Sequence, residues 1–133
     1  MMRGMMTNEE FFKEEYPIAI WHPIYYSAYS SSEEVFCIGV VALYPDTPDV
    51  AFKQNRLSDF FNEEYARGLE GVFNTTRSSL EDHFLTNRSL VGWVSPFEGI
   101  RLGATGTSTS PTLEGVLVDA LTLSSDLWNY APN

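Results

Sequence analysis

The side chains of this chain that could perform acid–base or metal chemistry occur mainly as adjacent pairs of acids. These pairs are Glu9–Glu10, Glu14–Glu15, Glu33–Glu34 and Glu63–Glu64. Two carboxylates can share a proton or hold a metal ion when both point at one atom. Neighbouring residues of a helix or strand point in different directions, so such pairs rarely converge. The pairs therefore indicate a solvated acidic surface rather than a catalytic site.

The residues that most often act as nucleophiles, bases or metal ligands are few. His22 and His83 are far apart in the sequence, and neither belongs to a metal-binding spacing. Cys37 is the only cysteine of the sequence and lies in an apolar run, which favours a small core residue over a reactive thiol. Because no nucleophile elbow or phosphate loop is present either, the sequence predicts no metal site and no cofactor.

One Gly-rich segment keeps an enzymatic function open. Gly103–Ser110 precedes an expected helix, whose free N–H groups can bind an anion. The segment lacks the Lys of a phosphate loop, so a plain surface loop is the other interpretation. With Arg101 it would form the site of a small hydrolase or nucleotide-processing enzyme. That hypothesis predicts a concave pocket holding a titratable group with a shifted pKa.

Aromatic residues are the better clue to function. They make up 14% of the chain, which is more than a small core must use. Aromatic rings rimmed by charged groups are typical of protein-binding surfaces. The alternative, that the rings simply fill the core, stays open. The residues predicted to form the binding site are Trp21, Tyr25, Tyr26, Glu33, Glu34, Trp93, Phe97 and Arg101.

The charge of the chain restricts the class of partner. Its 133 residues include 18 acidic and 8 basic ones, a net charge of −10. This opposes direct binding to nucleic acid or to an anionic membrane, both of which require clustered Lys and Arg. It favours a protein partner with a basic or nucleic-acid-binding surface. Since neither a signal peptide nor a membrane span is recognisable, we expect a cytoplasmic protein.

The segment that organises the predicted fold is Val35–Tyr44. It is uncharged, rich in β-branched residues and followed by Pro45-Asp46, which predicts a strand buried on both faces. We expect residues 1–133 to form one α+β domain, with a mainly antiparallel sheet of about five strands covered by two to four helices. Residues 1–16 are expected to form a short N-terminal helix or an arm.

Further strands are expected on both sides of this segment. Tyr25–Ser30 should pair with it as a hairpin, with Pro23 marking a break, a bulge or an edge position. If the edge at Tyr25–Tyr29 is free, a second copy could pair there, which leaves a homodimer open. The other predicted strands are Val50–Lys53, Leu90–Val94 and Ile100–Ala104.

Three helices are expected after the hairpin. The first is capped by Ser58 or Asp59, and the second by Ser78 or Ser79. The apolar stripe of the first helix includes Phe60, Phe61, Tyr65, Leu69, Val72 and Phe73. The third helix begins at Ser110-Pro111, with Trp128 and Tyr130 in a packed tail behind it.

Residues 34–41, Gly92–Pro96 and Ile100–Leu102 resemble motifs of an uncharacterised bacterial family of small α/β domains that are often encoded beside HipA-like kinases. Residues 34–41, Glu-Val-Phe-Cys-Ile-Gly-Val-Val, are similar to its first motif. Gly92–Pro96, then Ile100–Leu102 and a helix after Pro111, are similar to its C-terminal half. The resemblance implies the fold and no activity, because polar residues typical of the family are replaced here by Cys37 and Phe97.

Two hypotheses follow. The first is a non-enzymatic binding or inhibitory module of antitoxin, immunity or anti-defence type, which uses an acidic, aromatic surface against a basic site on another protein. The second is the small enzyme with its site near Gly103–Ser110. The charge and the missing catalytic motifs favour the first.

Overall fold

The computed structural model describes residues 17–27 and 35–130, apart from the side chains of residues 125–130. The predicted arm at residues 1–16 and the predicted site residues Glu33 and Glu34 lie outside this range. The elements are β1 (Ile18–Tyr26), β2 (Phe36–Leu43), β3 (Val50–Gln54), the 3-10 helix η1 (Leu57–Asp59), α2 (Glu63–Asn87), β4 (Ile100–Leu102), β5 (Gly106–Thr109) and α3 (Leu113–Tyr130).

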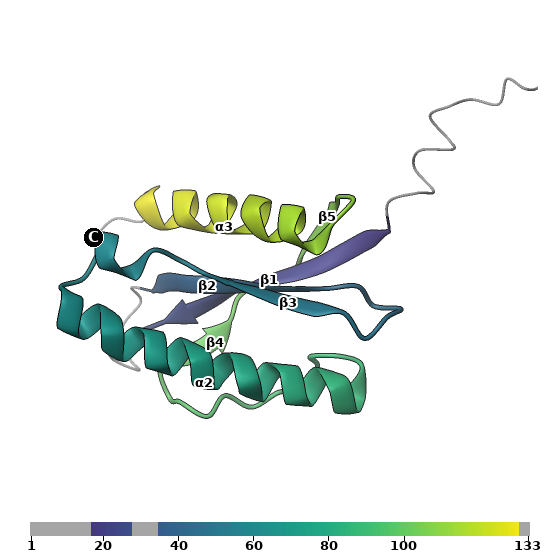
Figure 1. The fold of residues 1–133 in the computed structure, drawn as a ribbon, viewed down its shortest axis with the longest axis horizontal. Coiled ribbons are helices and arrows are strands. Elements are labelled where there is room, and N and C mark those ends of the chain that lie inside the picture. Colours follow the sequence, from purple (N-terminus) through teal and green to yellow (C-terminus); the bar gives the residue numbers. More distant parts are fainter. Residues whose placement is uncertain (1–16, 28–34, 131–133) are drawn as a thin grey trace, which may run out of the picture.

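The described elements form three layers, with the sheet between α2 and α3 (Figure 1). The strand order is β3-β2-β1-β4, β5 also pairs with β1, and every pairing is antiparallel. This confirms the predicted α+β fold, in which a mainly antiparallel sheet of about five strands is covered by two to four helices. None of the helices in the described part of the chain has the length and apolar character that crossing a bilayer requires.

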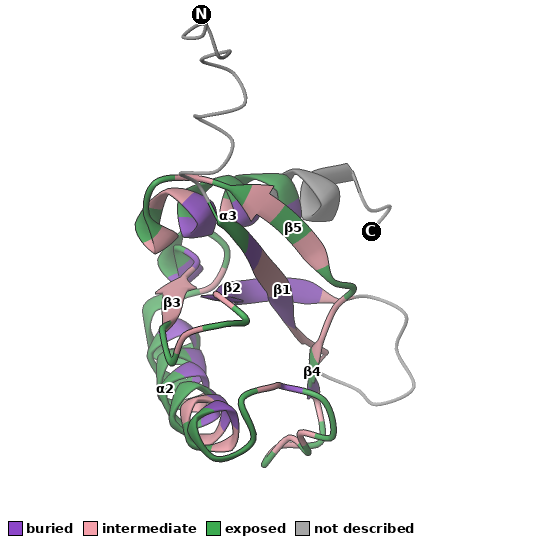
Figure 2. Cartoon of the chain, turned by 90° about the vertical axis from the view of Figure 1, so that its right-hand side faces the viewer, coloured by how far each residue is buried: buried purple, intermediate pink, exposed green. Residues whose placement is uncertain are grey.

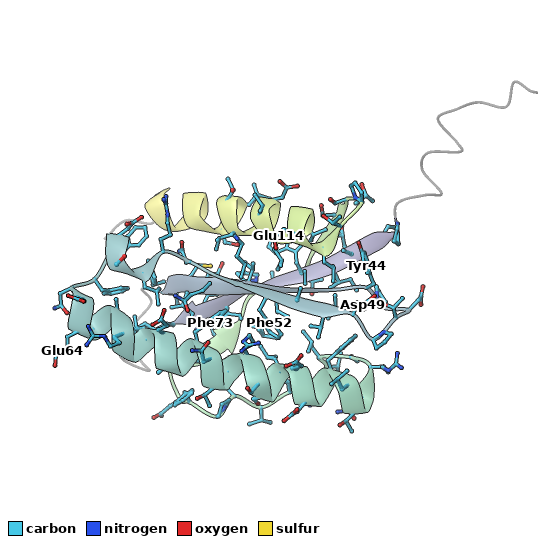
Figure 3. The ribbon with its side chains drawn as sticks, viewed as in Figure 1. Tyr44, Asp49, Phe52, Glu64, Phe73 and Glu114 are labelled. Atoms are coloured by element: carbon cyan, nitrogen blue, oxygen red, sulfur yellow. The ribbon has the colours of Figure 1, made fainter. Side chains whose placement is uncertain are left out.

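β2 is the centre of the sheet, as predicted. All eight of its residues are buried, because β1 and β3 pair with its edges and a helix covers each face (Figure 2). The residues that face α2 are Phe36, Ile38, Val41 and Leu43, and those that face α3 are Cys37, Val40 and Ala42. In Figure 3, Phe52 and Phe73 lie between the sheet and α2, whereas Tyr44 belongs to the α3 side.

A β-bulge interrupts the alternation of β2. Ile24 pairs with Gly39 and Tyr25 with Cys37, which leaves Ile38 without a partner on β1. The buried Asn55 supports the bulge: its backbone N–H donates to Ile38 O and its Nδ2 donates to Cys37 O, both at 2.8 Å. The carbonyls that the bulge exposes are therefore satisfied.

β1 is an interior strand. Of the three alternatives expected at Pro23, the break and the edge position are wrong, whereas a bulge in the pairing with β2 does follow, at Ile24 and Tyr25. Residues 18–21 pair with β5 and residues 24–26 with β4, so Pro23 falls between the two partners. Its carbonyl accepts from Gly103 N at 2.8 Å. A residue's N–H and C=O point to the same neighbouring strand, so the missing N–H of Pro23 faces the connection between β4 and β5. Tyr25 and Tyr26 consequently offer no free edge.

α2 is one helix of 25 residues, not two. Its N-cap is Asn62, whose Oδ1 accepts from Tyr65 N at 2.8 Å, so Ser58 and Asp59 were wrong predictions for this cap. The helix continues through Asn74-Thr75-Thr76, where Thr76 is buried and satisfies its hydroxyl by donating to Val72 O at 2.8 Å. The predicted caps Ser78 and Ser79 therefore lie inside the helix.

The last third of the chain differs from the prediction in three places. Leu90–Val94 is an irregular segment with Val91 and Val94 85% and 81% exposed, rather than a strand. The expected loop contains β5, because Gly106–Thr109 pairs with the start of β1. α3 begins at Leu113, where the Thr112 hydroxyl accepts from Gly115 N at 3.1 Å, and the predicted tail residues Trp128 and Tyr130 belong to this helix.

Candidate functional site

The sheet separates the predicted site residues into two groups. Trp21, Tyr25 and Arg101 lie on the α3 side, since Trp21 and Tyr25 pack on that core and Arg101 is opposite Tyr25 in β4. Tyr26, Trp93 and Phe97 pack on the α2 side. A single patch cannot include both groups, because a five-stranded sheet lies between them.

The rings on the α3 side cover glycines of the neighbouring strands. A Cβ at Gly106 would overlap the Trp21 ring, and one at Gly103 would overlap the Tyr25 ring. Rings that pack on backbone in this way stabilise the sheet. Burial, with a smaller contribution from Cys37, raises the pKa of the Tyr25 phenol, and the Arg101 guanidinium acts in the opposite direction. This group contributes chiefly to the sheet.

Trp93 and Phe97 attach the segment after α2 to the core. Trp93 Nε1 donates to Ser79 Oγ at 2.9 Å. The side chains of Trp93 and Phe97 are both half-buried. The Ser95 hydroxyl donates to Phe97 O at 2.8 Å and forms a tight turn before β4. These two aromatic residues therefore have a structural role in the described segment.

A cluster of aromatic rings, two of them exposed, lies instead at the N-terminal end of α2. We call this cluster the aromatic end, and it consists of Tyr26, Phe36, Phe60, Phe61 and Tyr65. The Phe36 ring lies 4.9 Å from both Phe60 and Phe61, edge to face, and Phe61 stacks on Tyr65 at 5.1 Å. The hydroxyls of Tyr26 and Tyr65 share a hydrogen bond of 2.6 Å. Phe36 is buried, whereas Phe60 and Tyr65 are 44% and 43% exposed.

Local backbone structure fixes the two exposed rings. The N–H groups of Phe60 and Phe61 both donate to Leu57 O at 3.0 Å, which closes a turn after η1. Asn62 then caps α2 and holds the backbone of Tyr65. These hydrogen bonds fix the backbone that carries Phe60 and Tyr65, so the two residues have few backbone degrees of freedom to lose on binding.

Two acidic residues adjoin the aromatic end at the start of α2. Glu63 and Glu64 occupy the first turn of α2, where the helix dipole favours negative charge. Glu63 pairs with Arg67 at 3.0 Å, whereas Glu64 makes no ion pair with the described residues and lies on the outside of the helix (Figure 3). The sequence of α2 contains five acids and two arginines, so its surface is negative overall.

The histidines and the cysteine of the described residues are held separately, each by its own surroundings. The described residues include no group of three His, Cys, Asp or Glu side chains placed to hold a metal. His22 Nδ1 lies 3.0 Å from Gly103 O and His83 Nε2 lies 2.9 Å from Val91 O, so each ring is held by a backbone carbonyl. Burial raises the pKa of the Cys37 thiol to about 11, which keeps it protonated at neutral pH.

The helical spacing of Phe60, Phe61 and Tyr65 predicts the buried stripe of a helix, so these residues are absent from the predicted site. A signal for the site is present: two Phe residues directly before Asn62, a strong N-cap residue, must lie outside the helix that Asn62 begins. Comparisons of the chain with protein-family models, with curated proteins and with solved structures found no match.

Proposed function

We propose that the protein is a non-enzymatic binding module of the inhibitory kind, such as an antitoxin, an immunity protein or an anti-defence protein. It binds a protein partner through the aromatic end, and the partner presents a basic surface of the kind that binds nucleic acid. The proposal rests on one observation, the exposure of Phe60 and Tyr65 beside the acidic first turn of α2.

Aromatic rings at this place suit an energetic centre of an interface. Tyr is enriched among the residues that contribute most of the binding free energy, and large rings bury much apolar area at low entropic cost. Phe60 and Tyr65 expose less than half of their surface, so a partner would complete their burial without unfolding anything. The buried Phe36 and the Tyr26 hydroxyl hold them from behind.

Charge indicates the chemistry of the partner. The chain carries −10, and Glu63 and Glu64 stand next to the rings. A basic partner would be attracted over a distance of about 10 Å at moderate salt, and the attraction would weaken as salt rises. A nucleic-acid-binding protein fits this requirement, because its own ligand is a polyanion.

A capture experiment with matched variants tests the proposal. The full chain, immobilised through a tag, is incubated with lysate of its host at low and at high salt, and captured proteins are identified by mass spectrometry. We expect one protein with a basic surface, captured at low salt and released at high salt. Phe60→Ala and Tyr65→Ala should abolish capture, whereas Tyr65→Phe, which keeps the ring, should retain it.

Leu85→Ala is the control for these variants. Leu85 lies on the same helix and is 51% exposed, but it belongs to the opposite end of α2. Loss of capture with this variant as well as with Tyr65→Ala would indicate a general effect of apolar surface and contradict the proposal. Circular dichroism of each variant verifies that the fold is retained.

The structure offers less to the enzymatic alternative. That hypothesis requires a pocket near Gly103–Ser110 that contains a titratable group with a shifted pKa. A cavity does lie beside Thr105, but the two described groups whose pKa is shifted, Tyr25 and Cys37, do not line it. The two features that would together favour an enzyme are therefore separate in the described part of the chain.

A further inference from the structure

A cavity of about 310 Å³ opens on the α2 side of the sheet, at the C-terminal end of α2. α2 has 25 residues and a length of about 37 Å, so this cavity is remote from the aromatic end. The walls come from β1, from the end of β2, from the segment after α2 and from the region between β4 and β5. No contact described for the aromatic end involves these walls.

The floor of the cavity is apolar. Ile20, Leu43, Leu90 and Leu102 provide it, and each comes from a different segment of the chain. Leu43 and Leu90 are buried, whereas Ile20 and Leu102 remain half-exposed within the hollow. An apolar group placed there would remove this surface from water, at about 25 cal/mol per Å² of apolar area.

The rim supplies a cation and hydroxyl groups. Among the described residues that line the cavity, Arg88 is the one with a formally charged side chain. Arg88 makes no ion pair with any residue of the described part of the chain. Ser89 Oγ accepts from Val91 N at 3.0 Å, so its hydroxyl hydrogen remains available to a ligand. Thr105 adds a second hydroxyl on the rim.

The position of Arg88 is fixed by the end of the helix. Its backbone N–H donates to Phe84 O at 2.6 Å, and its φ of 57° is in the left-handed region that terminates α2. This conformation is unusual for a residue other than Gly or Asn, so the helix end alone gives no reason for an arginine here. Binding of an anionic ligand by the guanidinium would account for an arginine at this position.

We propose that this cavity binds a small organic acid: its carboxylate pairs with Arg88, and its short apolar chain lies on Ile20, Leu43 and Leu102. The volume is at the lower limit of ordinary ligand pockets, about 300–1,000 Å³, which restricts the ligand to a small molecule. The net negative charge of the chain opposes an anion only weakly, because charges more than about 10 Å away are screened at moderate salt.

Hexanoate is a suitable probe, with the neutral hexanamide as its analogue of equal chain length. Each is titrated into the ¹⁵N-labelled full chain, and backbone amide shifts are followed by NMR. We expect saturable shifts at the segments that form the cavity, and binding of hexanamide weaker by about tenfold, the contribution of one charge-assisted hydrogen bond. Absence of saturation, or equal binding of the two compounds, would overturn the proposal.

Two matched pairs of variants locate the site. Val91 lines the cavity and Val94 does not, although both are more than four-fifths exposed, so Val91→Glu should abolish hexanoate binding while Val94→Glu leaves it unchanged. Arg88→Asn removes the cation and suits a positive φ, and Arg77→Asn removes one from the same helix outside the cavity. We expect Arg88→Asn to bind hexanoate about tenfold more weakly than the unaltered protein, and Arg77→Asn to bind it equally well. If the two variants of either pair bound hexanoate with equal affinity, the proposed site would be wrong.

Discussion

The surroundings of Cys37 determine its chemistry. Its thiol donates to Gly39 O at 3.2 Å and is fully buried on the α3 side of β2. The Ser124 hydroxyl is buried nearby and acts to stabilise a thiolate, but burial is the larger effect and raises the pKa from 9.0 to about 11. Cys37 is therefore a core residue that stays protonated well above neutral pH.

This shift predicts how stability depends on pH. Below pH 9 the thiol keeps its proton in both states, so its contribution to stability is complete there. Between pH 9 and about 11 the unfolded chain ionises while the folded protein does not, so the free energy of unfolding falls, by about 2–3 kcal/mol. Urea unfolding across this range measures the fall. The Cys37→Ala protein should show a smaller decrease in the free energy of unfolding. An equal decrease in both proteins would show that the Cys37 thiol does not cause it.

For single residues, the sequence predicted whether a side chain is buried better than it predicted the hydrogen bonds of that side chain. The burial of Cys37 follows from the apolar run around it, and the structure confirms it. The role of Asn55 could not be read in advance, because its amide is needed only where the bulge leaves Cys37 O without a strand partner. Such contacts depend on the register of two strands, which is set by the whole sheet.

Among the elements, β2 and α2 approach each other closely at Gly39. A Cβ on this residue would overlap the Phe73 ring and would also press on Lys53 O. The absence of a side chain thus allows the helix to pack directly on the bulge. Gly68, in contrast, lies in α2 with open space around its Cα.

Alanine at these two glycines should act in opposite directions. Gly39→Ala must displace a buried ring and backbone, so we expect the free energy of unfolding to fall by about 1–3 kcal/mol. Gly68→Ala removes backbone entropy from the unfolded chain without a clash, so stability should rise by about 0.5–1 kcal/mol. Urea unfolding of both variants measures the difference. A stable Gly39→Ala protein would show that α2 can move away from the sheet at little cost.

The errors in the predicted elements have a common physical reason. Asn74-Thr75-Thr76 are poor helix formers, but burial of Thr76 and of the apolar face of α2 outweighs their propensity. Gly106–Thr109 has a loop composition, and it becomes a strand because β1 offers it unpaired backbone groups. Local sequence cannot show either effect, since both come from segments distant in the chain.

The whole molecule is held together by its two apolar layers. α3 contacts the sheet through Val116, Leu117 and Ala120, all buried. Lys53 of β3 and Glu114 of α3 form an ion pair of 3.3 Å, but both side chains are partly exposed. An exposed pair contributes little in water, so the apolar contacts must provide most of the attachment.

Two substitutions in α3 distinguish these contributions. Leu117→Ala should lower the free energy of unfolding by about 2–5 kcal/mol, because it leaves a cavity in a packed layer. Glu114→Gln should change it by no more than about 0.5 kcal/mol. Thermal or urea unfolding of both variants measures the contrast, with the second variant repeated at high salt, where no further change is expected. A large effect of Glu114→Gln would mean that charge holds α3 in place.

At the scale of the molecule the sequence predicted the architecture and only part of the candidate site. One uncharged strand with a covering helix on each face follows from Val35–Tyr44 and from the amphipathic segments around it. The aromatic residues were recognised as a group, but consecutive residues such as Tyr25 and Tyr26 point to opposite faces of the sheet. The residues of the aromatic end come from β1, β2, the turn between η1 and α2, and α2 itself, so only the folded chain brings its rings together.

The pairing of β1 has a consequence for how the chain folds during synthesis. One side of β1 pairs with β2, the next strand along the chain, whereas the other side must await residues 100–109. On the ribosome, the N-terminal hairpin and α2 therefore emerge while a row of β1 amide and carbonyl groups still lacks its strand partners. Such a row is a template for association with other chains. Fragments that end before β4 should therefore aggregate, and closure of these long-range contacts should limit the folding rate.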